Sequence, residues 1–133
     1  MTQQIQVLPN GTKIHLYAGS PHREDGPAVE RPDGFKAWYF HGKCHRDGDL
    51  PAIIREDGSE EWHHHGQKHR ITVGPDGKTL PAMVEASGYK AWYLDGLLHN
   101  EDGPAVMRPD GTVVYCLNGK GLTKAEAEKH YAL

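Results

Sequence analysis

The sequence predicts an all-β protein, an elongated stack of antiparallel β-hairpin repeats with a short C-terminal capping helix. Three observations carry this prediction. In each of five successive copies, a glycine is followed eight residues later by a second glycine. In four of these copies a Pro-Ala pair stands seven residues before the first glycine, and in four a histidine stands three residues after the second. A fixed period of this kind indicates an internal repeat, in which each unit covers its neighbour.

The copies define five expected hairpin units within one repeat domain, residues 1–133. Each first glycine follows a residue that favours turns, and together these dipeptides suit hairpin turns that need a positive φ. The turn dipeptides are Asn10-Gly11, Asp33-Gly34, Asp57-Gly58, Ser87-Gly88 and Asp110-Gly111.

Residues 27–40 show the logic of one unit. Two short runs that favour β-structure flank the turn, and pairing outward from the turn sets Val29 opposite Trp38. Strand alternation then places both of these side chains on the same face as Phe40. Because both faces are largely apolar, we expect each hairpin to be sandwiched between its neighbours.

Each hairpin is followed by a second tight turn, and after the first four a connector begins with His-Arg or His-Asn. From that histidine to the next proline, the connectors advance 5, 6, 12 and 5 residues. The long connector, Ile71 to Leu80, contains an extra turn at residues 74–77. Insertions in repeat proteins map to one face of the array, and often to its binding face.

The two ends of the chain differ from the repeats. Thr123 and Glu126 fit a capping box, and the residues that follow favour a helix from about Lys124 to Ala132. This helix is expected to cover the last hairpin, as terminal caps do in repeat arrays. Residues 2–8 can supply a strand at the other end, where an uncovered hairpin edge would favour a homodimer.

Charge and hydropathy exclude several classes of protein. The net charge of −3 is not the basic footprint of a general nucleic-acid binder. No apolar run approaches the roughly 18 residues that span a bilayer, and the N-terminus does not resemble a signal peptide. We therefore expect a soluble, cytoplasmic protein with no specific nucleic-acid partner and no membrane span.

The repeat pattern resembles that of MORN repeats. Trp-Tyr-x-x-Gly-x-x-His-Arg is followed by Gly-Pro-Ala and then Asp-Gly, at a spacing of about 23 to 24 residues. The closest likeness is to a divergent bacterial and bacteriophage variety with the signature His-Arg-x-Asp-Gly-Pro-Ala, nearly complete at residues 22–28 and 99–105. The resemblance covers residues 8–122, although the two middle copies lack the glycine before proline. It implies β-hairpin arrays that serve as scaffolds, bind proteins or dimerise, without catalytic residues.

We therefore predict a non-enzymatic protein–protein interaction module that needs no cofactor. The bacteriophage variety favours a sharper hypothesis, a phage-encoded inhibitor of a host protein or bacterial immune complex, acting in the host cytoplasm. The expected contacts come from the long connector and from an aromatic column five residues after each first glycine. These candidate partner-binding residues are Tyr39, His63, Tyr93, Val73, Pro75, Asp76 and Lys78.

The run His63-His64-His65 suggests a protein of another class. Together with His69 or His41 it could ligate zinc or nickel, which would make the chain a metal-binding protein or a metal-dependent enzyme. Strand alternation would place His63 and His65 on one side. Other residue types fill the same repeat positions in the other copies, so we assign no metal ligand.

The remaining polar and aromatic patterns recur with the repeat. We interpret the His-Arg pairs, together with Asp25 and Asp102, as hydrogen bonds that join repeats, because acid–base sites are usually singular. The Trp column is expected to be buried between hairpins. Cys44 and Cys116 lie in different repeats, so a disulfide is open, and no thiol nucleophile is indicated.

Overall fold

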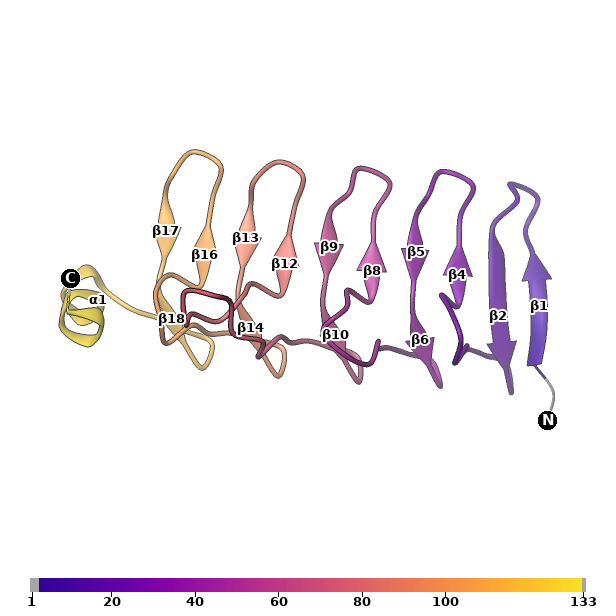
Figure 1. Cartoon of the computed structure of the whole chain (residues 1–133), viewed down its shortest axis with the longest axis horizontal. Coiled ribbons are helices and arrows are strands. Elements are labelled where there is room, and N and C mark those ends of the chain that lie inside the picture. Colours follow the sequence, from indigo (N-terminus) through magenta and orange to yellow (C-terminus); the bar gives the residue numbers. More distant parts are fainter. Residues whose placement is uncertain (1–2, 133) are drawn as a thin grey trace. The chain divides into compact units, whose positions relative to one another are not determined.

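The computed structural model describes residues 3–132, which form β-hairpins followed by one C-terminal helix (Figure 1). The predicted all-β class and the hairpin repeats are confirmed. The chain divides into two compact units, one ending at Gln67 and the other beginning at Lys68. The single domain over residues 1–133 stays a prediction, and residues 1, 2 and 133 lie outside the described part.

The first unit contains an antiparallel sheet in the order β1-β2-β4-β5-β8-β9, with β3 paired to β2, and a separate β6-β7 pair. The sheet strands are β1 (Gln3–Val7), β2 (Lys13–Tyr17), β3 (Ser20–Pro21), β4 (Val29–Glu30), β5 (Lys36–Ala37), β8 (Ile53–Ile54) and β9 (Glu60–Glu61). The others are β6 (Tyr39–Phe40), β7 (Lys43–Cys44) and β10 (His63–His64), and β11 (Gln67–Lys68) holds the boundary between the units.

The second unit repeats the arrangement. Its sheet has the order β12-β13-β16-β17, and β14-β15 and β18-β19 form two-stranded pairs. The strands are β12 (Met83–Val84), β13 (Lys90–Ala91), β14 (Tyr93–Leu94), β15 (Leu97–Leu98), β16 (Val106–Met107), β17 (Val113–Val114), β18 (Cys116–Leu117) and β19 (Lys120–Gly121), followed by α1 (Lys124–Tyr131).

The register of the hairpins differs from the predicted one by a single residue. Val29 pairs with Ala37 and not with Trp38. The backbone N–H of Arg31 donates to the carbonyl of Phe35 at 2.9 Å, so three residues form the loop. Such a loop places glycine in the left-handed region, and Gly34 has a φ of 101°. A slip of one residue moves every side chain to the other face, so the predicted faces were wrong.

Neighbouring hairpins join along their edges, and the predicted face-to-face sandwich was wrong. In the first unit β2 pairs with β4 and β5 with β8, and in the second β13 pairs with β16. The alanine of the Pro-Ala pair makes part of each join, because its carbonyl accepts from the fourth residue after the preceding turn glycine. These bonds run from His15 to Ala28 (2.7 Å), from Trp38 to Ala52 (2.7 Å) and from Trp92 to Ala105 (2.8 Å).

The core is built largely from small side chains. Six alanines, two from each of two hairpins and one from each of two more, are at most 1% exposed: Ala28, Ala37, Ala52, Ala82, Ala91 and Ala105. The predicted burial of the Trp column is confirmed for Trp62 and Trp92. Trp38 is half-buried, with the Arg46 guanidinium 3.8 Å from its ring centroid. Close packing around alanine leaves little room for a larger side chain.

The second tight turns occur where the sequence predicted them. In each, a non-glycine residue with a φ of 47° to 53° precedes a glycine whose φ is also positive, as in a type I′ turn. The non-glycine residues are Ala18, His41, His65, Asp95 and Asn118.

The C-terminal helix is confirmed to within one residue. Thr123 and Glu126 form the capping box, and α1 ends at Tyr131. The rings of Tyr131 and Tyr115 lie 5.0 Å apart, and the Tyr131 hydroxyl donates to the carbonyl of Asn100 at 2.6 Å. The helix therefore packs on the last hairpin, as a terminal cap is expected to do.

Candidate functional site

The repeated histidines join neighbouring hairpins through one conserved geometry of contact. In each case the histidine Nδ1 accepts a hydrogen bond from a backbone N–H of the next type I′ turn. The donor is the non-glycine residue that precedes the turn glycine. The pairs are His41 to His22 (2.9 Å), His65 to His45 (3.0 Å), Asp95 to His69 (2.9 Å) and Asn118 to His99 (2.9 Å). An Nδ1 that accepts must be unprotonated, so each of these neutral rings carries its proton on Nε2.

The residue after each histidine makes a second repeated bond. Its side chain donates to the carbonyl of the proline in the following Pro-Ala pair, at 2.7 to 3.2 Å. The donors are Arg23, Arg46, Arg70 and Asn100. The structural interpretation of the His-Arg pairs is thereby confirmed, because these groups hold the connectors in place.

Asp25 and Asp102 also bind neighbouring groups. Asp25 accepts from Arg23 Nε at 2.9 Å, and this bond is the main reason that the pKa of Asp25 lies below its usual value. Asp102 accepts from the backbone N–H of Thr79 at 2.9 Å. Asp25 therefore holds its connector, whereas Asp102 reaches into the long one.

The histidine run divides between two environments, and the expectation that His63 and His65 share a side was wrong. His63 Nε2 lies 3.2 Å from Glu61 Oε1, while His64 and His65 approach His45. The positive φ of His65 belongs to a turn, so strand alternation does not extend to it.

Potential ligand atoms of His45, His64 and His65 lie within 4.8 Å of one another. Two contacts oppose a shared ion. The lone pair of His45 Nδ1 is already used by the His65 N–H, and its Nε2 lies 2.8 Å from Asp47 Oδ1. The His45 and His65 rings are also stacked, with centroids 4.2 Å apart and an angle of 13°. Because imidazole binds zinc in the ring plane at about 2.0–2.1 Å, two stacked rings cannot share an ion unless one rotates.

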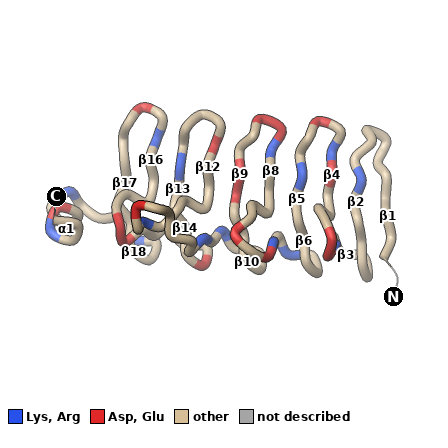
Figure 2. Tube along the Cα trace, in the orientation of Figure 1, with Lys and Arg blue, Asp and Glu red and all other residues tan. Residues whose placement is uncertain are grey.

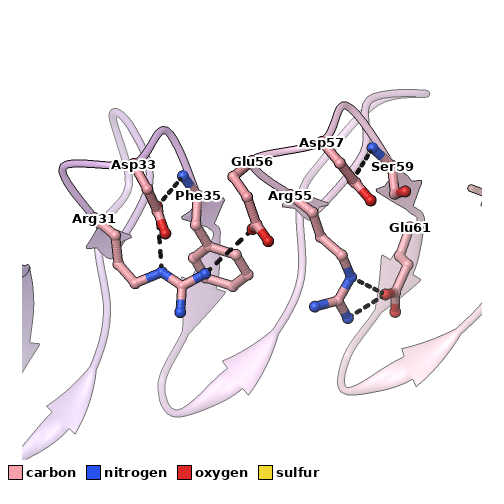
Figure 3. A network of polar contacts seen from close by, with 8 residues as sticks. All are labelled: Arg31, Asp33, Phe35, Arg55, Glu56, Asp57, Ser59 and Glu61. Carbon is pink, nitrogen blue, oxygen red and sulfur yellow. Dashed lines mark hydrogen bonds and ion pairs between the residues drawn. The ribbon is translucent and has the colours of Figure 1, made fainter. Parts of the chain in front are cut away.

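Glu61 is a buried carboxylate in a position that is alanine in two other hairpins. It is 5% exposed, and it accepts from Arg55 Nε at 3.1 Å and from Arg55 Nη2 (Figure 3). Burial, with a contribution from the Glu61 charge, raises the pKa of Cys44 to about 12. A thiol with so high a pKa is a poor nucleophile, and Cys44 and Cys116 are both free.

The long connector forms a small hairpin of its own. Val73 bridges to Thr79, and the N–H of Leu80 donates to the carbonyl of Thr72 at 2.9 Å. The Thr79 carbonyl accepts from Trp92 Nε1 at 2.7 Å. With the bond from the Thr79 N–H to Asp102, these contacts fix the insertion to the buried Trp column on one side and to the next connector on the other.

This connector hairpin exposes aliphatic side chains beside a cleft. Ile71 is 67% exposed and Val73 is 58% exposed. The cleft has a volume of about 340 Å³, and Tyr93 and Leu94 line it together with polar groups from the next connector. Lys68 Nζ lies 5.2 Å from the centroid of the Tyr93 ring.

The structure brings together only part of the predicted partner-binding set. Val73 and Tyr93 line the cleft, whereas Pro75, Asp76 and Lys78 are exposed at the connector turn. Tyr39 lines a different cleft, in the first unit. The His63 side chain is only 10% exposed.

Ile71 and Asp102 contribute to the cleft and were missing from the predicted set. The sequence carried a signal for Ile71, an aliphatic residue at the connector position that holds Glu24, Asp47 or Glu101 in the other copies. Asp102 was assigned to the polar ladder, and nothing in the spacing indicated that it reaches the long connector.

Fold and contacts define a β-hairpin repeat protein whose recurring polar residues join its repeats. No protein-family model matches this chain, and no curated protein sequence matches it. Within residues 3–132, no helix has the length and apolar character that a membrane crossing requires.

Proposed function

We propose that this protein is a non-enzymatic, MORN-like binding module that engages another protein through the connector hairpin, residues 71–80, and the cleft beside it. One observation carries the proposal. The connector is the longest departure from the repeat, and it holds Ile71 and Val73 in an ordered hairpin with most of each side chain exposed. Insertions in repeat proteins often lie on the binding face.

The chemistry of the surface specifies the kind of partner. The cleft lining combines apolar side chains, among them Ile71, Val73 and Tyr93, with the charged residues Arg70, Glu101 and Asp102. An apolar centre inside a polar rim is the usual anatomy of a protein interface. The partner is therefore a protein segment that inserts an aliphatic or aromatic side chain beside Val73.

The periodic use of the polar groups supports a binding function over an enzymatic one. Each connector histidine and the residue after it bind backbone atoms of the next hairpin or connector. A catalytic acid or base must instead reach a substrate proton.

The resemblance to the bacteriophage variety of MORN-like repeats suggests a narrower form of the proposal. In that form the chain is phage-encoded, acts in the host cytoplasm, and inhibits a host protein or bacterial immune complex. Identification of the partner captured from bacterial lysate tests this narrower form.

The test compares two doubly substituted proteins. Ile71→Ser with Val73→Ser removes the exposed aliphatic side chains of the connector, while Leu50→Ser with Val113→Ser removes two exposed aliphatic side chains that do not line the cleft. A partner captured from bacterial lysate by the wild type should be lost with the first variant and kept with the second. Titration of the purified partner should show affinity reduced at least about tenfold, because interface anchors cost more than 1.4 kcal/mol when truncated.

A third variant, with the connector shortened to the five-residue form, checks the assignment independently. Unfolding by urea must first show that it is folded. If the partner binds all three variants like the wild type, the connector is not the contact surface. A substrate turned over by the protein and lost on a point mutation would contradict the non-enzymatic function.

A second candidate function, metal binding, rests on the closeness of His45, His64 and His65. It requires one of the stacked rings to turn and His45 to give up a hydrogen bond. Titration of the untagged protein with zinc or nickel tests it, with His64→Ala as the matched variant. Stoichiometric binding that is lost in the variant would support this candidate, and binding unchanged by the substitution would refute the site.

A further inference from the structure

β1 is the outer strand of the first unit's sheet and carries no charge. All five of its residues are exposed, with Ile5 at 59% and Val7 at 61%. Figure 2 shows this strand without blue or red, whereas the strands that follow it carry Lys and Glu. Proteins usually protect such an edge with charges, proline or a bulge, and β1 has none of these side chains.

The pairing with β2 determines which backbone groups of β1 face outward. The N–H of Leu8 donates to the carbonyl of Thr12 at 2.8 Å, so the backbone groups of Leu8 point toward β2. Backbone direction alternates along a strand, so Gln4 and Gln6 also point toward β2. The N–H and C=O groups of Gln3, Ile5 and Val7 therefore point away from β2, and no strand within residues 3–132 pairs with them.

The strand is complementary to itself. In an antiparallel pair of two β1 strands, residues whose backbone groups point away from β2 must lie opposite residues of the same kind in the other copy. Only one register of this kind pairs all five residues of both strands. That register sets Ile5 opposite Ile5 of a second copy, Gln3 opposite Val7, and Gln4 opposite Gln6. Every pair is uncharged, so like charges never meet across the interface.

We propose that two copies of this chain pair through their β1 strands, antiparallel, with the two-fold axis at Ile5. Edge-to-edge pairing is how the hairpins of one copy already join, since Lys13 pairs with Glu30 and Ile14 with Val29 across β2 and β4. A second copy therefore extends the sheet by the same geometry. The β1 strand belongs to the first unit and the connector hairpin to the second, so separate substitutions test dimerisation and partner binding.

Charge substitution at Ile5 provides the test. Sedimentation velocity over a concentration series should show a reversible dimer for the wild type. Ile5→Lys and Ile5→Glu should each weaken dimerisation at least about tenfold, because two like charges then meet at the axis. An equal mixture of the two variants should restore the dimer as a heterodimer. Ile5→Thr, which keeps a β-branched uncharged residue, should dimerise within about threefold of the wild type.

Recovery in the mixture separates the proposed pairing from other edge contacts, because only a two-fold at residue 5 brings Lys and Glu together. A wild type that stays monomeric at about 1 mM would overturn the proposal. So would a dimer that persists in Ile5→Lys, or one that fails to return in the mixture. Binding of an unrelated protein's strand to β1 with no self-association is the competing outcome and would also overturn it.

Disulfide trapping supplies a second measurement if a charged variant fails to fold. On mild oxidation, Ile5→Cys should form a covalent dimer at least about tenfold faster than Lys36→Cys, because paired Cα atoms about 5.5 Å apart fit a disulfide. Lys36 is exposed on an interior strand and serves as the matched control. Equal rates would contradict the register.

Discussion

Strands β9 and β13 occupy the same place in two repeats, and their second residues differ sharply in chemistry. Glu61 in β9 and Ala91 in β13 stand three residues after the turn glycine, and both are buried. Three residues before that glycine, the β8–β9 hairpin has Arg55 and the β12–β13 hairpin has Glu85. Arg55 binds the buried carboxylate with two nitrogens, and Glu85 could offer only a like charge.

This difference shows that the repeat determines the burial of a position but not the type of side chain that occupies it. The backbone position fixes burial, because both hairpins share one register relative to their turns. The residue across the turn decides which side chain can occupy that position. A buried carboxylate costs several kcal/mol unless a partner compensates it, and Arg55 supplies that partner.

The largest predicted effect comes from copying Glu61 into the hairpin of β12 and β13. Ala91→Glu should lower the free energy of unfolding by about 3 kcal/mol or more, because it buries a charge beside Glu85. Urea unfolding at neutral pH measures this loss. Adding Glu85→Arg should recover part of it by recreating the Arg55–Glu61 pair. A loss below about 1 kcal/mol in the single variant would show that the position is less closed than its burial indicates.

The next largest effect on the free energy of unfolding should come from replacing a connector histidine. His45→Ala should cost about 2 kcal/mol, because it leaves the backbone N–H of His65 without its acceptor and removes a buried ring. His45→Asn should cost less, since the amide oxygen can stand near the position of Nδ1. Thermal and urea unfolding compare the two. Equal losses would mean that packing of the ring, and not the hydrogen bond, provides the stability.

The reverse exchange, in the hairpin of β8 and β9, should have a smaller effect. Glu61→Ala should lower the free energy of unfolding by only about 1 kcal/mol, because losing the desolvation cost of the buried carboxylate offsets much of the penalty of leaving the buried His63 Nε2 without its partner at 3.2 Å. Arg55, whose side chain is 45% exposed, can return to water. Urea unfolding of wild type and variant checks this. A loss of 3 kcal/mol would show that the ion pair stabilises this hairpin far beyond the cost of burying it.

His15 is another exception to the repeat, because it stands in the Trp column, and its effect should appear only in mild acid. Burial, and then the Arg23 guanidinium, lower the pKa of His15 below its ordinary value of 6.5. The unfolded chain therefore takes up this proton at a higher pH than the folded chain does. Stability from this group is complete above about pH 6.5 and falls as the pH drops toward the lowered pKa.

The measurement is urea unfolding between pH 7.5 and 5 for the wild type and for His15→Tyr. Tyrosine is chosen because Tyr115 occupies the same column in the last hairpin. The variant should lose less stability over this range than the wild type. Because every other histidine is unchanged, the difference isolates His15. Parallel curves for the two proteins would contradict the assignment.

Local features of this fold were predictable from the sequence. The Asp-Gly and second-glycine turns depend on backbone conformations within a few residues, and so does the capping box at Thr123. The hairpin register was not predictable, because two-residue and three-residue loops use the same Asp-Gly dipeptide. They differ only in which backbone pair closes the loop, and that hydrogen bond depends on the paired strand.

The candidate site was predictable in outline. The excess length of the third connector pointed to residues 71–80, and Val73 and Tyr93 do line one cleft. The partners that fix the connector, Asp102 and Trp92, lie 23 and 13 residues from Thr79 along the chain. Their contacts follow from the position of the connector against the next hairpin. No spacing rule connects them to the connector.

The sequence by itself determined the number and order of the hairpins, the places of their turns and the C-terminal cap. These follow from periodic glycine, proline and histidine, whose effects are local or recur with the repeat. Only the tertiary structure decided the edge-to-edge pairing, the burial of Glu61 against Arg55 and the separation of His63 from His64 and His65. Those outcomes depend on which backbone groups meet across neighbouring strands, and a shift of one residue in that pairing exchanges the two faces of every hairpin.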